Sequence, residues 1–356
     1  MRKIIVFDVP AEFGGVMTIL HEVYEEALRT KDIQWEFIVG KANLKSKGHV
    51  TVRKYPWVKK SWFHRLFFDF FVAPKIARKS GADVIFSLEN VAIRGTKLPQ
   101  VLYMQQALMF SDHKYSFSES KTYWFYQNIL SRSTFSAMRK CKTIVQTKWM
   151  KEAAVQMAHA KPGDVYVVAP HMTDYEPVPF RDTLDARRCF FYPVGCMPYK
   201  HHDTIIDAAE ALNAEDFKVI FTSESPAVRE MAKKAEKHID FAGSMLHEKV
   251  IELYGRSVLV FASELESFGL PLMEARIAGS IIFTADTPFA REILCGYPNA
   301  YFFPVGDSVC LARYMQQCIS GELKYSEDIP EYRPDTLTGW SSVVQILKSA
   351  MCKQES

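Results

Sequence analysis

The sequence predicts an α/β protein built from two doubly wound, Rossmann-like domains. Its 356 residues exceed the length at which one hydrophobic core usually keeps growing, so two domains are expected. Short β-branched and aromatic runs alternate with helical patterns along the whole chain, which is typical of parallel α/β layers. A proline-rich segment near the middle separates two such series.

The first series opens with an apolar run that ends at Asp8. No cleavage site follows this run, so it predicts a strand rather than a signal peptide, and we expect a cytoplasmic protein. The strand-like runs of this first series cover residues 4–9, 35–39, 84–88, 101–104, 143–146 and 165–168.

The second series follows the proline-rich segment 169–179, the expected linker. Its strand-like runs cover residues 189–192, 218–222, 239–242, 257–262 and 280–284. The last helical pattern, residues 340–351, comes after a broken stretch and could pack against either domain. We therefore expect domains at 1–169 and 170–335, and a C-terminal helix within 336–356 that could cross back to the first domain.

Composition and charge exclude several classes of protein. A net charge of +3 is too small to predict nucleic-acid binding, and no nucleic-acid-binding module is recognisable. The seven cysteines are scattered without metal-ligand or redox spacing, so we expect reduced thiols and no metal site. No stretch reaches the roughly 18 uncharged apolar residues that a membrane span requires, so any membrane contact should be peripheral.

The segment from Glu266 to Glu274 carries the clearest chemical signal. It follows a buried strand-like run, and Pro271 suits the first turn of a helix. Gly269 permits close approach of a ligand, and the amides of residues 267–270 would face it from the positive end of that helix. Two acids alone would fit a capped surface helix, but the intervening residues favour an anion cradle flanked by two carboxylates.

Residues 266–275, Glu-Ser-Phe-Gly-Leu-Pro-Leu-Met-Glu-Ala, resemble the signature motif of family-4 retaining glycosyltransferases. The residues at 253–254, 279–282 and 288–293 fall where such enzymes carry the neighbouring helix, strand and loop. The resemblance implies a GT-B fold, in which two Rossmann-like domains face a central cleft. It also implies sugar transfer from a nucleotide diphosphate sugar with retention of configuration, without a metal or other cofactor.

The resemblance assigns donor binding to the second domain and acceptor binding to the first. Glu274 would hold the donor ribose, and Glu266 would lie near the transferred sugar as a catalytic residue. The donor phosphates would meet the segment whose backbone forms the cradle: Ser267, Phe268, Gly269 and Leu270.

A second site is predicted around Lys200, in a segment that resembles the family's first strand, loop and helix of the donor domain. With no metal present, this lysine would bind the leaving diphosphate as a catalytic and donor-binding residue. The alternative is that Lys200 is a solvent-exposed lysine of a loop, without a functional role. Many relatives carry an arginine where this chain has Cys196, a difference shared by some polysaccharide-assembly relatives.

The first domain departs further from the family pattern. Gly15 lies in a turn after the first strand, where the family places a loop near the donor phosphates, although a glycine pair there is often only a tight turn. Relatives commonly have a histidine facing the sugar where this chain has Gln105, or Gln106 if the register shifts by one residue. Either glutamine could bind an acceptor or sugar hydroxyl, and we predict a catalytic role for Gln105.

The stretch from Arg53 to Lys79 combines basic and aromatic residues with a single acid, Asp69. Such a segment suits an anionic membrane surface, but packing of the aromatic side chains into the first domain explains them equally well. If it meets the membrane, it agrees with a glycan acceptor carried on a lipid, in polysaccharide or O-antigen assembly on the inner face of the membrane.

Two alternatives remain at this point. An epimerase or phosphorylase could share the two-domain architecture, but neither signature is visible. A catalytically silent protein of the same fold, which binds a nucleotide or glycan, would agree with the departures at Cys196 and Gln105. Retention of Lys200, Glu266 and Glu274 favours an active enzyme.

Overall fold

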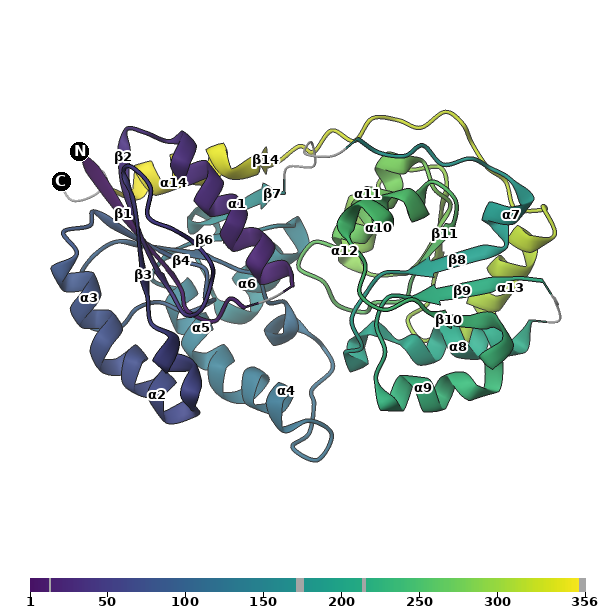
Figure 1. Cartoon of the computed structure of the whole chain (residues 1–356), viewed down its shortest axis with the longest axis horizontal. Helices are drawn as coiled ribbons and strands as arrows, with labels where there is room; N and C mark the ends of the chain where they lie inside the picture. Colours follow the sequence, from purple (N-terminus) through teal and green to yellow (C-terminus); the bar gives the residue numbers. More distant parts are fainter. Residues whose placement is uncertain (13, 171–175, 213–215, 352–356) are drawn as a thin grey trace. The chain divides into compact units, whose positions relative to one another are not determined.

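The computed structural model describes residues 1–12, 14–170, 176–212 and 216–351 (Figure 1). The chain forms two compact units, one of Met1–His171 with Pro334–Ser356 and the other of Met172–Arg333. Each unit is an α/β layer structure around a parallel sheet, which confirms the predicted fold class. Part of the expected linker, residues 171–175, lies outside the described residues.

The first unit contains a parallel sheet in the order β14-β7-β6-β5-β4-β1-β2-β3. Its central strands are buried on both faces, as expected for a parallel sheet covered by helices. The strands are β1 (Arg2–Asp8), β2 (Ile33–Val39), β3 (Val50–Lys54), β4 (Val84–Ser87), β5 (Gln100–Tyr103), β6 (Lys142–Val145), β7 (Val165–Ala169) and β14 (Leu337–Thr338).

Helices cover both faces of this sheet. Ile4 and Val6 of β1 belong to the core cluster that includes α1 (Gly15–Arg29) and α14 (Gly339–Met351), whereas Ile5 and Phe7 face the opposite side. The C-terminal helix α14 therefore packs within the first unit. The other helical segments here are η1 (Pro56–Lys60), α2 (Trp62–Phe67), η2 (Phe68–Val72), α3 (Ala73–Lys79), η3 (Leu108–Phe110), α4 (Lys121–Phe125), η4 (Tyr126–Leu130), α5 (Ser131–Met138), α6 (Lys148–Ala158) and η5 (Pro162–Asp164).

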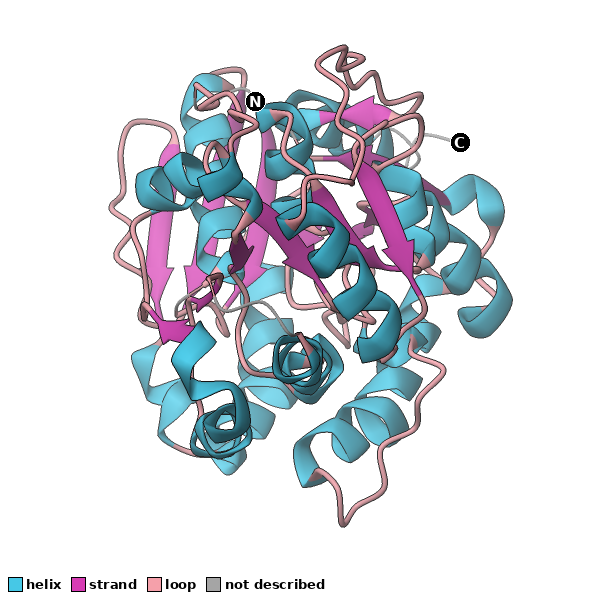
Figure 2. Cartoon of the chain, turned by 90° about the vertical axis from the view of Figure 1, so that its right-hand side faces the viewer, coloured by secondary structure: helices cyan, strands magenta, loops and turns pink. Residues whose placement is uncertain are grey.

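The second unit contains a parallel sheet in the order β10-β9-β8-β11-β12-β13, with helices on both of its faces (Figures 1 and 2). The strands are β8 (Cys189–Tyr192), β9 (Lys218–Phe221), β10 (Ile239–Phe241), β11 (Val258–Phe261), β12 (Ile282–Ala285) and β13 (Ala300–Phe303). The helical segments are α7 (Leu184–Arg187), η6 (Pro198–Lys200), α8 (His202–Ala211), α9 (Pro226–Ala232), η7 (Lys233–His238), α10 (His247–Tyr254), α11 (Leu270–Ala278), α12 (Pro288–Ile293) and α13 (Ser308–Ile319).

Each sheet has one point at which the strand order reverses. In the second unit the chain runs outward from β8 through β9 to β10, and then returns to place β11 on the other side of β8. In the first unit the same reversal separates β1 from β4. Ligands of open α/β sheets bind beyond the carboxyl ends of the strands at such reversals, so the loops after β8 and β11 are the first place to look.

Candidate functional site

The loop after β11 leads into α11 through Gly269. This glycine has a φ of 95°, a left-handed conformation that side chains disfavour, and an added Cβ would lie 3.4 Å from the side chains of Leu272 and Phe289. Pro271 lies in the first turn of α11, as the sequence predicted. The chain therefore turns sharply at the predicted cradle and enters a helix at once.

The backbone amides at this turn are available to a ligand. The carbonyl of Gly269 accepts hydrogen bonds from the amides of Leu272 and Met273 as the helix begins. Among the described residues, none accepts a hydrogen bond from the amides of Phe268, Gly269 or Leu270. Unsatisfied amides at the positive end of a helix are suited to bind a phosphate.

Glu274 lies in the second turn of α11, and its side chain is 10% exposed. The hydroxyl of Tyr254 donates to its Oε2 over 2.9 Å, and Nε2 of His247 lies 2.8 Å from its Oε1. Both partners come from α10. Each carboxylate oxygen can accept two hydrogen bonds, so Glu274 is held in place and keeps capacity for ligand hydroxyls.

The contact with Glu274 raises the pKa of His247 above its ordinary value, mainly because the carboxylate is a hydrogen-bond partner of the ring. The sequence did not reveal His247 as a member of this group. Its place depends on how α10 docks against α11, and no sequence spacing reports that packing. Tyr254 was noticed only as part of the preceding helix.

Lys200 lies at the end of η6, in the loop after β8, with its side chain 7% exposed. Its Nζ forms an ion pair with Oε1 of Glu266, from the loop after β11. The amide of Glu264 donates to the carbonyl of Tyr199 over 2.9 Å, which ties the same two loops together. Two residues that are distant in sequence therefore meet at the reversal point of the second sheet, and the solvated loop lysine is excluded.

Glu266 and Glu274 have different surroundings although they lie in one short segment. Glu266 is paired with a lysine, whereas Glu274 accepts from a tyrosine and contacts a histidine. Their chemical roles can therefore differ, as the sequence suggested. Among the described residues, no group of His, Cys, Asp and Glu side chains could hold a metal ion.

The remaining predicted residues belong to the first unit. The amides of Gln105 and Gln106 donate to Oδ1 of Asn90 over 2.7 and 3.2 Å. The side-chain amide of Gln105 donates to the carbonyl of Leu88, while its Oε1 is buried and has no partner among the described residues. Oε1 of Gln105 is therefore a buried acceptor without a partner among these residues, whereas Oε1 of Gln106 accepts from the amide of Leu108.

Gly15, the predicted donor-binding glycine of the first unit, is the first residue of α1. An added Cβ would meet no atom within 4 Å, so the backbone there is open to a ligand. Its preceding neighbour Gly14 has a φ of 67°. A role for Gly15 with the donor remains a prediction.

A buried acidic cluster that the sequence did not predict lies where β1 and β4 end. Oε1 of Glu89 accepts from the amide of Val9 over 2.7 Å, and its Oε2 pairs with Arg65 over 2.5 Å. The nearby carboxyl of Asp8 is 2% exposed, and its Oδ2 has no partner among the described residues. Burial, together with the charge of Glu89, raises the pKa of Asp8 to about 8.

Replacing Asp8 with asparagine should stabilise the protein at neutral pH. The folded state keeps a proton on Asp8 that the unfolded state releases above its ordinary pKa of 3.8, so stability falls as the pH rises from about 4 to about 8. Asp8→Asn removes this loss, and the free energy of unfolding should rise by about 1–3 kcal/mol at pH 7 and hardly change near pH 4. Urea unfolding at both pH values measures the difference, with exposed Asp112→Asn as the control. An equal gain at both values would contradict this explanation.

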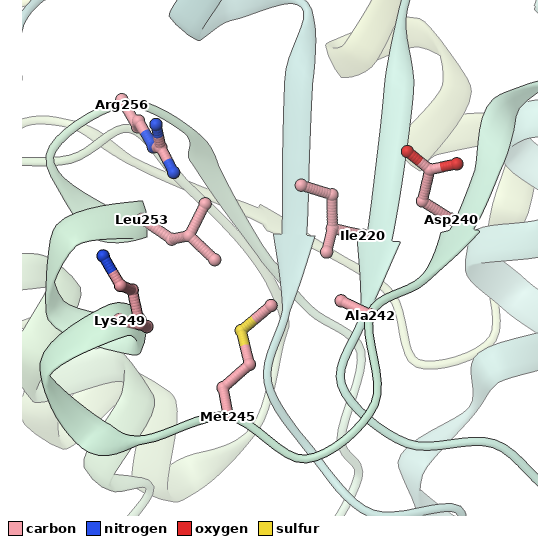
Figure 3. Close-up of a pocket in the computed structure, with 7 residues that line it drawn as sticks. All are labelled: Ile220, Asp240, Ala242, Met245, Lys249, Leu253 and Arg256. Atoms are coloured by element: carbon pink, nitrogen blue, oxygen red, sulfur yellow. The ribbon is translucent and has the colours of Figure 1, made fainter.

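A separate pocket of about 290 Å³ lies between the β9–β10 edge and α10 (Figure 3). Lys249, Leu253 and Arg256 line it from one face of α10 and just beyond its end, whereas His247 and Tyr254 contact Glu274. The pocket therefore contains none of the predicted site residues. Its lining residues are Ile220, Asp240, Ala242, Met245, Lys249, Leu253 and Arg256.

Comparisons with known proteins agree with this geometry. Residues 186–335 match the family described as glycosyl transferases group 1. No curated protein matches the sequence.

Solved structures similar to this chain include the lipopolysaccharide outer core galactosyltransferase WaaB, with 15% identity, a TM-score of 0.64, and coverage of 92% of this chain and 93% of that one. WaaG, a glycosyltransferase involved in lipopolysaccharide biosynthesis, has 13% identity, a TM-score of 0.67, and coverage of 89% and 90%. Anabaena HepE in complex with UDP-glucose has 16% identity, a TM-score of 0.62, and coverage of 90% and 91%. At these identities the likeness establishes the fold.

Proposed function

We propose that this chain, a GT-B protein with a group 1 glycosyl transferase domain over residues 186–335, transfers a sugar from a nucleotide diphosphate sugar to a glycan acceptor. The transfer retains the anomeric configuration and uses no bound metal. The observation that carries this proposal is the pairing of Lys200 with Glu266 at the reversal point of the second sheet, beside the amide cradle that leads to Glu274.

In this proposal, the donor diphosphate lies against the amides of Phe268, Gly269 and Leu270, with Ser267 beside them. The carboxylate of Glu274 accepts hydrogen bonds from the ribose hydroxyls, and Tyr254 fixes its orientation. Gly15, the first residue of α1, is proposed as a further donor-binding residue. Each contact uses an atom or backbone group that the fold already orients, which lowers the cost of ordering the site on binding.

Lys200 is the charge that replaces a metal. When the bond between the sugar's anomeric carbon and the phosphate oxygen breaks, negative charge grows on the leaving diphosphate, and the Lys200 ammonium stabilises it. The acceptor oxygen forms the new bond on the same face, and its proton passes to the leaving phosphate. Glu266 accepts hydrogen bonds from the sugar hydroxyls, and Gln105 offers its Oε1 to a sugar or acceptor hydroxyl.

For the acceptor we propose a glycan carried on a lipid, in cell-surface polysaccharide or O-antigen assembly at the inner face of the membrane. The similar structures WaaB and WaaG are named for lipopolysaccharide synthesis, which supports this class of acceptor. No helix among the described residues has the length and apolar character to cross a bilayer. We propose peripheral contact with the membrane through the basic and aromatic stretch from Arg53 to Lys79.

Release of nucleoside diphosphate from a panel of nucleotide sugars tests the proposal. The active enzyme should release the nucleoside diphosphate from at least one nucleotide sugar of the panel in the presence of EDTA. Proton NMR of the product should show the same anomeric configuration as the donor. A catalytically silent protein of the same fold would bind a nucleotide sugar without releasing the diphosphate. Inversion of configuration would contradict the proposed mechanism.

Donor affinity should depend on pH through His247. Its protonated ring is hydrogen-bonded to Oε1 of Glu274 and makes that oxygen a weaker acceptor for a ribose hydroxyl, so donor binding should lower the raised pKa of His247 and release a proton. Affinity should therefore increase as the pH rises from the ordinary value near 6.5 through the raised value, and His247→Gln should remove this dependence. Calorimetric titration with UDP-glucose at several pH values measures this dependence, because the diphosphate ester of UDP-glucose has no ionisation in this range. If the affinity of His247→Gln changed with pH as steeply as that of the wild type, the proposed role of His247 would be wrong.

A further inference from the structure

The exposed aromatic side chains of the described residues all lie in two short segments of the first unit. The α2–η2 segment, residues 62–72, carries Trp62, Phe63, Phe67, Phe70 and Phe71, which are between 50% and 78% exposed. The α4–η4 segment with its preceding turn, residues 117–130, carries Phe117 and Tyr126 together with exposed Ile129. Large exposed apolar patches on a folded protein mark a surface that meets a partner or a membrane.

The two segments meet in space although they are distant in sequence. The rings of Trp62 and Phe125 are 5.0 Å apart, and Figure 1 shows α2 and α4 as neighbours. In both segments an α-helical turn continues into a π-helical turn. The two segments therefore adjoin at this contact, and we call their exposed apolar side chains together the aromatic face.

The aromatic face is firmly attached to the unit. Phe68 is completely buried and packs against Tyr55 and Trp57, with ring centroids 5.4 and 6.0 Å away. Arg65 reaches inward to Glu89. Packing into the core thus explains some aromatic residues of the basic stretch, but it does not explain those whose side chains remain exposed.

The charges that border the aromatic face are predominantly positive. The single acid of its first segment, Asp69, pairs with Arg65 over 2.8 Å. The only acid of its second segment, Glu119, lies in the turn before α4. The exposed basic residues of and beside the two segments include Lys60, Lys75, Arg78, Lys79, Lys121 and Arg132.

We propose that the aromatic face is a docking surface for an anionic lipid bilayer. The exposed aromatic rings enter the interfacial layer of the bilayer, and the flanking lysines and arginines bind the lipid phosphates. This is the pattern of interfacial membrane proteins. The inference builds on the proposed lipid-linked acceptor and adds α4–η4 as a second membrane-binding segment. Binding to vesicles can be measured without any sugar transfer.

Flotation with phosphatidylcholine vesicles, with and without phosphatidylglycerol, tests the proposal. The wild type should float with the anionic vesicles, and Phe63→Ser/Phe71→Ser should weaken this binding at least about tenfold. Both side chains are exposed, at 78% and 66%, so folding should be preserved, and an unchanged melting temperature checks this. Val309→Ser in α13, also 78% exposed, is the matched control and should bind as the wild type does.

Charge and self-association provide the remaining arms. Lys60→Glu/Lys79→Glu should abolish the preference for anionic vesicles. Unchanged flotation of the phenylalanine double variant would overturn the proposal. So would a wild type that binds no vesicles and forms a dimer, if the double variant is a monomer, because the aromatic face would then bind a second copy of the chain. Diphosphate release, measured without vesicles, separates the docking proposal from the proposed function. If neither the wild type nor any variant releases diphosphate, the proposed function fails while the result with vesicles stands.

Discussion

Lys200→Ala should lower the turnover number by about two to three orders of magnitude while the KM for the donor changes little. The Lys200 ammonium is nearly buried, so its charge acts in a medium of low dielectric constant on the leaving diphosphate. This interaction strengthens as charge develops in the transition state, and it therefore affects turnover more than ground-state binding. Steady-state kinetics of diphosphate release measure both parameters.

The loss must be separated from structural damage at Glu266, which would lose its ion-pair partner. If the unpaired carboxylate damaged the structure, Lys200→Ala would also bind the donor more weakly and melt at a lower temperature, whereas loss of the transition-state charge alone leaves both close to the wild-type values. Lys249→Ala removes an exposed lysine of the same unit and should behave as the wild type. Wild-type turnover in Lys200→Ala would eliminate the assigned role.

Glu274→Ala should weaken donor binding by about 10- to 100-fold and leave turnover at saturating donor almost unchanged. The carboxylate is held by Tyr254 and His247 before any ligand arrives, so ribose hydroxyls would meet a preorganised acceptor. The ribose hydroxyls take no part in the bond change, so these contacts stabilise the ground state and the transition state equally. Calorimetry measures the affinity for the donor, and steady-state kinetics of diphosphate release measure the turnover.

Tyr254→Phe is the graded partner of this experiment. It keeps the carboxylate and removes the hydroxyl that donates to Oε2, so donor affinity should fall by about threefold to tenfold. Glu248→Ala removes an exposed acid from α10 and should leave affinity unchanged. If Glu274→Ala lowers turnover but not affinity, Glu274 acts on the reaction itself and the ribose assignment is wrong.

Much of the fold could be predicted because its central strands are continuous apolar runs, such as those at β4 and β11. Three strands were missed. The edge strand β3 ends in two basic residues and is mostly exposed or half-buried, and β14 has only two residues. The half-buried β13 was also overlooked as an edge strand. Edge and very short strands bury less apolar surface and so leave a weaker pattern.

Residues of the candidate site were predictable where their own segment carries a recognisable pattern. Residues 266–274 could be interpreted because the glycine, the proline and the two acids occupy one turn and one helix. Contacts between distant segments were not: the partners His247 and Tyr254 depend on helix packing, and the Lys200–Glu266 ion pair joins two loops. Asp8 illustrates the same limit, because its altered pKa results from tertiary burial.

The central claim is that the second unit binds a nucleoside diphosphate on the amides that precede α11. A crystal structure with the diphosphate that stabilises the protein most tests it directly. We expect the ribose hydroxyls on the carboxylate of Glu274 and a phosphate on the amides of Phe268, Gly269 and Leu270, with Lys200 nearby. Density for the nucleotide elsewhere, such as in the pocket beside Lys249 and Arg256, would contradict the claim, as would the failure of every diphosphate to bind.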